Sequence, residues 1–342
     1  MMNYINLSEL KIGRKQQAGI MSVYPLLAED VNTSLANFED IKFKGTSGYG
    51  TMVFENKSEL PFIIPTGYSV ITKQLAQDHA LPFASLLAPN TIRNIDEACC
   101  IQQTQGGYID GSKVTEFSIL PLYIRKKHFE KYVVERGNHG NINVNVSFLS
   151  FSRLWDCISS FQKDLVKKSE GNLVYFFNKF MDKLTQFNAE FEVVDGQRGA
   201  IIMLNDRIVG IEVAPTHKYW KTIWNSLIRD CYGSEVIRLT MQNLIEEFKT
   251  SQELDMDISG CKSVEEIQKA IDAFYTEDSK KVADKIKDLE SMETVEVPAS
   301  NNLIKENSYE DITYHIMKVK NRNIYGEAYC DNGQMVYCSL LF

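Results

Sequence analysis

The chain lacks the long apolar segments and the leader that membrane and secreted proteins carry. Nowhere do about 18 apolar residues follow one another without a charge, and the start, MMNYINLSEL, has no charged region followed by an apolar core. The seven cysteines are an odd number, and no pair has the C-x-x-C spacing of zinc ribbons or thioredoxin-like motifs. We therefore expect a cytoplasmic protein whose cysteines stay reduced and which does not enter a membrane.

Motifs for phosphate loops, dinucleotides and metals are also missing. Neither GxxxxGK[ST] nor GxGxxG occurs. The five histidines are scattered, without the spacing of ligands that share a helix face: His79, His128, His139, His217 and His315. The sequence therefore predicts no metal site and no bound cofactor.

Positive charge is in deficit, with 37 basic against 45 acidic residues and a formal net charge of -8. This balance argues against a broad nucleic-acid surface, but it leaves a local basic site open. The densest basic run is Arg125-Lys126-Lys127-His128. Basic motifs this short often occur by chance, so we interpret the run as a solvated face rather than a phosphate clamp.

The first half of the chain has the short apolar runs, glycines and prolines typical of strands and turns. Residues 61–65 and 68–72 flank a predicted turn at Thr66-Gly67, and residues 84–103 give three further short runs. The β character continues through residues 113–127, and residues 142–148 alternate in the period of two that marks a half-buried strand.

Helical spacing follows, at residues 153–168 and 173–187. Residues 200–204 and 207–213 are then predicted to form a hairpin around Asn205-Asp206. Residues 216–250 return to helix, and we expect Trp220 and Trp224, one turn apart, to pack against this hairpin as core residues.

Residues 251–307 are rich in charge. Ser263 and Glu266 form a capping box before a short predicted helix, and residues 276–292 predict a second one. We interpret the segment as an exposed helical insertion or a mobile arm. Beyond it, Asp331-Asn332-Gly333 predicts another hairpin, and the ending CSLLF is expected to be buried.

Together these patterns predict an α+β fold. A β-rich core of short strands and hairpins carries packed amphipathic helices. At 342 residues and 44% hydrophobic, the chain can bury a substantial core. We expect a single composite domain over residues 1–342, with 251–307 as a charged helical insertion within it.

The stretch from Glu59 to Gly111 combines acidic, histidine, cysteine, amide and glycine residues in one short segment, which indicates a candidate binding or catalytic site. Asp78-His79 suits a general base with its partner, although we favour the simpler interpretation of a turn residue and a satisfied polar histidine. Cys99-Cys100 could supply a nucleophile, but no nearby pattern identifies a base, and buried cysteine usually acts as a small hydrophobe. A third group offers amides for a base edge and glycines for a phosphate: Gln102, Gln103, Gln105, Gly106 and Gly107.

These residues also carry a family resemblance. Residues 73–108, with their KQ, QD, LLAP and ACCIQ elements, resemble the first conserved half of the ARPP-1 domain. Residues 196–232 are similar to its second block, and GQMVYCSLLF to its terminal strand, so only residues 251–307 stand apart. The family is associated with ADP-ribosylglycohydrolase-like and rhodanese-phosphatase proteins. The resemblance implies a place in prokaryotic conflict systems that handle ADP-ribose or other NAD-derived nucleotides.

The chain departs from the family pattern at three positions. His79 stands where the family has arginine, Gln102 replaces a glutamate, and Tyr108 follows Gly107 where arginine is expected. An amide cannot ionise and tyrosine carries no positive charge, so these changes favour binding over catalysis.

Three functions follow as hypotheses. The first is binding or sequestration of an ADP-ribose-like or other NAD-derived nucleotide by Lys73, Gln74, Gln77, Asp78, His79, Gln102 and Gly107. The second is an enzyme that processes such a nucleotide, with Asp78 or His79 as acid-base. The third is a structural or interaction protein, such as a homo-oligomer, in which these residues only hold turns. The first hypothesis predicts saturable nucleotide binding without turnover, the second predicts product formation, and the third predicts neither.

Overall fold

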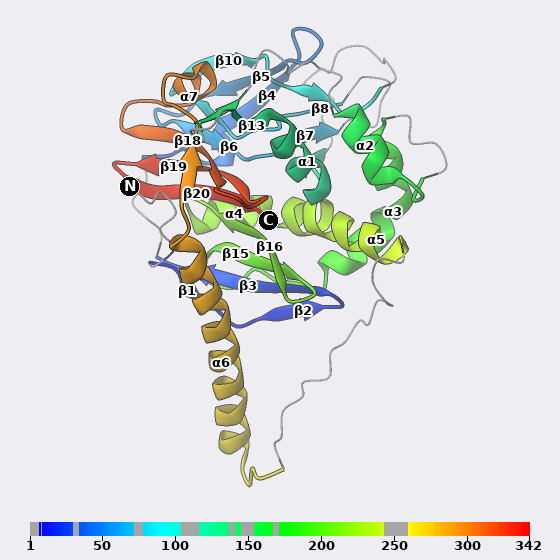
Figure 1. Cartoon of the computed structure of the whole chain (residues 1–342), viewed down its shortest axis with the longest axis vertical. Helices are drawn as coiled ribbons and strands as arrows, with labels where there is room; N and C mark the ends of the chain where they lie inside the picture. The colour runs from blue at the N-terminus through cyan, green and yellow to red at the C-terminus, as the bar shows by residue number, and fades with distance from the viewer. Residues whose placement is uncertain are drawn as a thin grey trace.

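The computed structural model (Figure 1) describes residues 7, 9–29, 34–71, 78–103, 116–136, 141–144, 154–166, 171–242 and 259–342. Strands and helices are mixed, and the strands pair in antiparallel sheets. The predicted α+β class is therefore confirmed.

The largest sheet has nine strands in the order β1-β3-β15-β16-β20-β19-β18-β17, with β2 paired to β3. Its strands are β1 (Lys11–Ile12), β2 (Gln16–Ala18), β3 (Met21–Leu27), β15 (Gln197–Leu204), β16 (Arg207–Val213), β17 (Thr294–Glu296), β18 (Ile312–Val319), β19 (Tyr325–Asp331) and β20 (Gln334–Leu341). The sheet thus joins the beginning, the middle and the end of the chain.

Two hairpins of this sheet turn where the sequence predicts. Asn205 and Asp206 have φ of 46° and 59°, and Asn332 and Gly333 have φ of 49° and 78°. Two successive left-handed residues make the type I′ turn, whose twist matches that of the flanking strands. Both predicted hairpins are therefore confirmed. Four of the five residues of the ending CSLLF lie in β20 and are buried, and Phe342 follows the strand and is partly buried.

The rest of the first half forms smaller sheets, as expected for its short apolar runs. They pair in the orders β10-β5-β4, β11-β8-β7-β12, β13-β14 and β6-β9. Their strands are β4 (Ile41–Gly45), β5 (Met52–Asn56), β6 (Phe62–Ile64), β7 (Tyr68–Ile71), β8 (His79–Ala80), β9 (Ser85–Leu87), β10 (Thr91–Ile95), β11 (Cys99–Cys100), β12 (Glu116–Ile119), β13 (Val133–Arg136) and β14 (Asn141–Val144). The predicted turn between β6 and β7 is confirmed, with Gly67 at φ 75°.

The predicted β character of residues 113–127 is wrong in its second part. After β12 the chain forms α1 (Leu122–Tyr132), which begins directly after Pro121. Proline suits a helix start because its fixed φ and missing N–H cost nothing there. The buried face of α1 includes Arg125 and His128 beside Leu122 and Phe129. These polar residues interrupt the apolar periodicity by which a helix is recognised in a sequence.

The interpretation of the basic run as a solvated face is also wrong for half of its members. Arg125 is 1% exposed and His128 is fully buried. Arg125 donates from Nη1 to Glu212 Oε1 at 2.8 Å and from Nη2 to Ser339 Oγ at 2.6 Å. Tyr232 OH donates to the same oxygen of Glu212 at 2.8 Å. Arg125 therefore ties α1 to two strands of the large sheet.

The helical regions after residue 153 are confirmed as far as residue 241, although the first is shorter than predicted, and residues 243–250 lie outside the described residues. The helices are α2 (Trp155–Gln162), α3 (Leu173–Asn188), α4 (His217–Asn225), a π-helix (Ser226–Gly233) and α5 (Ser234–Met241). Trp220 and Trp224 are buried in one cluster with Ala200, Ile202 and Leu204 of β15, which confirms their packing on the hairpin. Among the described residues no helix is long and apolar enough to cross a membrane.

Residues 264–290 form one helix, α6 (Val264–Glu290), where two were predicted. The predicted cap is present, since Ser263 Oγ accepts from the Glu266 N–H at 3.2 Å. The sequence has neither glycine nor proline between these bounds, so nothing stops the helix after its first turns. Figure 1 shows its N-terminal half projecting from the body, while Val282, Ile286 and Leu289 pack on the large sheet. β17 and α7 (Asn302–Glu306) follow, and β17 extends the sheet.

A second buried polar cluster joins residues of the first quarter of the chain to its C-terminal strands. Glu327 of β19 is fully buried and accepts hydrogen bonds from Thr66 Oγ1, Tyr314 OH and the Ala84 N–H, the last at 3.0 Å. Burial raises the pKa of Glu327 to about 7, although these donors and Arg125 act to lower it.

Gly199 of the β15–β16 hairpin is expected to be sensitive to substitution by alanine. A Cβ there would lie 2.3 Å from the carbonyl oxygen of Glu212, a backbone atom that cannot move without disturbing the strand pairing. We expect Gly199→Ala to lower the free energy of unfolding by about 1–3 kcal/mol, measured by urea denaturation. Gly48→Ala is the matched control, because nothing lies within 4 Å of its Cβ position. Equal midpoints for both variants would contradict the expectation.

Candidate functional site

The structure describes three of the seven residues predicted to bind ligand. Lys73, Gln74, Gln77 and Gly107 lie outside the described residues. Asp78, His79 and Gln102 are described, and strand pairing brings them together with Cys100. We call these four side chains the β8–β11 cluster.

Two very short strands build this cluster. His79 of β8 lies opposite Cys100 of β11 in an antiparallel pair, and the Ile101 N–H donates to the Asp78 carbonyl at 2.9 Å. Asp78 immediately precedes β8 and Gln102 follows β11 by two residues. The pairing therefore places the predicted carboxylate and amide side by side.

The carboxylate of Asp78 holds the amide of Gln102. Gln102 Nε2 donates to Asp78 Oδ2 at 2.5 Å, and the Asp78 side chain is fully buried while Gln102 is half-buried. Its amide oxygen accepts no hydrogen bond within the part of the chain that the structure describes. A buried carboxylate is tolerated when it is hydrogen-bonded, so this contact both satisfies Asp78 and fixes the orientation of Gln102.

His79 contacts the thiol that sequence analysis left without a base. Its Nε2 accepts from the Gly50 N–H at 3.4 Å and lies 3.2 Å from Cys100 Sγ. A backbone N–H can only donate, so the Gly50 contact favours the tautomer with Nε2 unprotonated, in which the Cys100 thiol would donate to Nε2. Burial raises the pKa of Cys100 to about 11, while a backbone contact with Gly50 opposes the rise. The thiol therefore stays protonated at neutral pH and is not an activated nucleophile.

The cluster can orient an amide and can offer an imidazole as acid-base. It cannot supply acid-base chemistry at position 102, where the amide does not ionise. Among the described residues, no three His, Cys, Asp or Glu side chains lie close enough to hold a metal ion.

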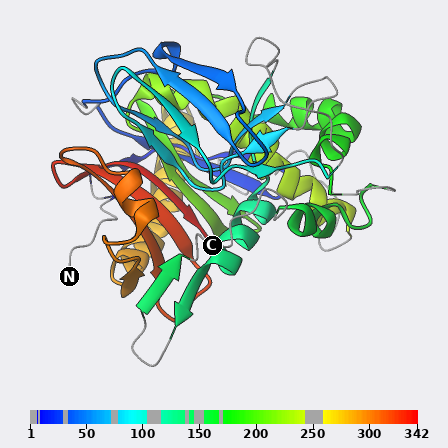
Figure 2. The same ribbon diagram turned by 90° about the horizontal axis from the view of Figure 1, so that it is seen from above.

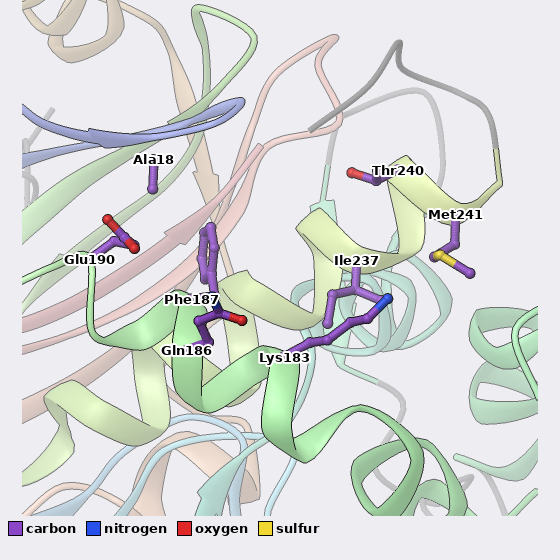
Figure 3. A pocket seen from close by; sticks show the side chains of 8 residues that line it. All are labelled: Ala18, Lys183, Gln186, Phe187, Glu190, Ile237, Thr240 and Met241. Carbon is purple, nitrogen blue, oxygen red and sulfur yellow. The ribbon is translucent and has the colours of Figure 1, made fainter. Parts of the chain in front are cut away.

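A separate pocket of about 370 Å³ lies between α3, α5 and β2 (Figure 3). Its walls are mainly apolar, with Phe187 lying near Ala18 and Ile237 further along the pocket, while Lys183 and Glu190 bring charge to it. None of the predicted site residues lines this pocket, and its lining residues form no motif that predicts a site.

One family model matches the chain. It is the ARPP-1 model, described as the ARG and Rhodanese-Phosphatase-superfamily-associated Protein domain, and it matches residues 9–307. The match runs through residues 251–307, which the resemblance had set apart, and it ends before β18, β19 and β20. No curated protein and no solved structure is significantly similar to the chain. Because the family model spans most of the 342 residues, the chain belongs to the ARPP-1 family.

Proposed function

We propose that the protein binds or sequesters an ADP-ribose-like or other NAD-derived nucleotide in a prokaryotic conflict system. The family supports this proposal through its association with ADP-ribosylglycohydrolase and rhodanese-phosphatase systems. The observation that carries it is the amide of Gln102, which the buried Asp78 holds in one orientation.

Such an amide suits the edge of a purine. Gln102 uses one N–H on Asp78, which leaves a second N–H and the amide oxygen. An amide with one donor and one acceptor can pair with the N7 and N6 groups of adenine. Because Asp78 restrains the side chain, less conformational entropy is lost when a ligand binds.

Binding fits the cluster better than turnover. Residue 102 cannot ionise, and the Cys100 thiol stays protonated because burial raises its pKa. The other proposed ligand-binding residues, Lys73, Gln74, Gln77 and Gly107, flank the cluster in sequence.

We expect Gln102→Ala to weaken ADP-ribose binding by about tenfold or more, the cost of one lost bidentate contact. Asp78→Asn should weaken it as well, because the fixed amide loses its charged acceptor. Isothermal titration calorimetry with ADP-ribose, NAD and AMP measures the affinities. Gln103→Ala, which truncates the exposed neighbouring amide, should bind like the parent protein. Absence of saturable binding for all three ligands, or equal affinities for Gln102→Ala and Gln103→Ala, would refute the proposal.

An enzyme that processes such a nucleotide is the second candidate, because the cluster holds the carboxyl of Asp78 and the imidazole of His79, either of which could act as acid-base. In that case NAD or ADP-ribose would be converted on incubation with the protein, and chromatography would detect the product. His79→Ala or Asp78→Asn would abolish turnover, while Gln103→Ala would retain it. Binding without any product would favour sequestration.

A further inference from the structure

A second, more polar cleft lies beside α1, away from the residues of the β8–β11 cluster. It has a volume of about 600 Å³, and its walls come from α1, α5 and the β15–β16 turn. Figures 1 and 2 both show α1 next to the C-terminal end of the chain, where Phe342 completes the wall. The volume falls in the range of about 300–1,000 Å³ that small-molecule sites occupy.

Cations dominate the charged side chains of this cleft. Four of its lining residues are basic and two are acidic: Lys126, Lys127, Arg207, Arg238, Glu130 and Glu235. The whole protein carries a net charge of -8, so this concentration of positive charge runs against its overall balance. A local cationic cleft of this kind attracts small anions.

Two of the four cations are neutralised by the two carboxylates. Lys127 Nζ pairs with Glu130 one helical turn along α1. Arg238 forms a bidentate pair with Glu235, at 2.8 Å from Nε and 2.7 Å from Nη2. Its guanidinium also lies 4.7 Å from the ring centre of Tyr123, so this wall of the cleft is held in place.

The other two cations, Lys126 and Arg207, form no ion pair with any residue that the structure describes. Lys126 is also half-buried, and burial lowers the pKa of its ammonium, although Glu130 acts to raise it. An anion beside Lys126 would stabilise its charged ammonium and so offset the hydration that burial has removed. Val209 and Leu239 provide an apolar wall in the same cleft.

We propose that the cleft beside α1 binds the phosphate or diphosphate group of a small molecule, with Lys126 and Arg207 as its ion-pairing residues. Phosphate carries the negative charge that could pair with these two cations. Arginine can bind it through two parallel N–H donors. The apolar wall of Val209 and Leu239 would contact the organic part of the ligand. This inference stands apart from the proposed function, because no residue of the β8–β11 cluster lines the cleft.

Titration calorimetry of the full chain with pyrophosphate and with ADP tests the site. We expect saturable binding, weakened by about tenfold or more in Lys126→Gln and in Arg207→Gln, since each removes one charge-assisted contact. Raising the salt concentration should weaken binding to the parent protein more steeply than to either variant. Lys221→Gln removes an exposed charge of α4 outside the cleft and should leave both affinities unchanged.

Gln102→Ala separates this inference from the proposed function, because it should not affect pyrophosphate binding. No saturable binding of pyrophosphate or ADP by the parent protein would overturn the inference. Equal affinities for Lys126→Gln, Arg207→Gln and Lys221→Gln would overturn it as well. Thermal unfolding midpoints close to that of the parent would show that the variants are folded.

Discussion

Replacing Arg125 by methionine is expected to lower the free energy of unfolding by about 3–5 kcal/mol, because it leaves the buried carboxylate of Glu212 without its cation. Arg125 and Glu212 are 1% and 4% exposed, and their ion pair measures 2.8 Å. Tyr232 OH still donates to Glu212 in the variant, but a hydroxyl carries no charge. Equilibrium unfolding in urea, followed by tryptophan fluorescence, measures the loss.

Two further variants show whether the unpaired charge is the cause. The double variant Arg125→Met/Glu212→Gln removes both charges, so it should recover part of the loss. Lys127→Met changes an exposed cation on the same helix and should alter stability by less than about 1 kcal/mol. A loss in Arg125→Met no larger than that in Lys127→Met would show that the buried pair does not stabilise the fold.

The buried carboxyl of Glu327 is expected to make the protein less stable as the pH rises from about 5 to 8. Burial raises its pKa in the folded state from the ordinary value of 4.5 to about 7. Between these two values the folded chain binds a proton that the unfolded chain releases, so stability falls with increasing pH. The shift corresponds to a loss on the order of 3 kcal/mol once the pH exceeds the folded-state pKa.

Comparison with Glu327→Gln isolates this contribution. The variant cannot titrate at this position, so its stability should change less between pH 5 and 8. His315, whose pKa is lowered by burial, acts in the opposite direction in both proteins and cancels in the comparison. Glu59→Gln, which changes an exposed glutamate, is the control and should keep the pH dependence of the parent protein. A pH dependence in Glu327→Gln as steep as in the parent protein would disprove the assignment.

Local chemistry made much of the fold predictable. The turns at Asn205-Asp206 and Asn332-Gly333 need backbone angles that these residues adopt readily, so both hairpins could be located from sequence. The spacing of Trp220 and Trp224 was likewise enough to place them in the core. Each of these features depends on neighbours only a few residues apart.

Features that depend on contacts between residues far apart in sequence could not be predicted from the sequence. The period of α1 was masked by Arg125, a residue type that is rarely buried unless a partner such as Glu212 is present. Within the candidate site, Asp78, His79 and Gln102 were named from their residue types and the family resemblance. Their contacts with each other and with Cys100 depend on strands of two residues, too short for any periodic signal.

The strand order of the large sheet has a consequence for how the chain folds during its synthesis. Met21 of β3 pairs with Leu204 of β15, and Gly210 of β16 pairs with Leu341 of β20. Such distant pairings must overcome the entropy of closing long loops, and proteins rich in them fold slowly. The ribosome makes β3 long before β15, and β16 long before β20. Until its partner has been made, each of these strands has one unpaired edge. Exposed strand edges pair with other chains, so the nascent protein is expected to depend on chaperones until β20 has been made.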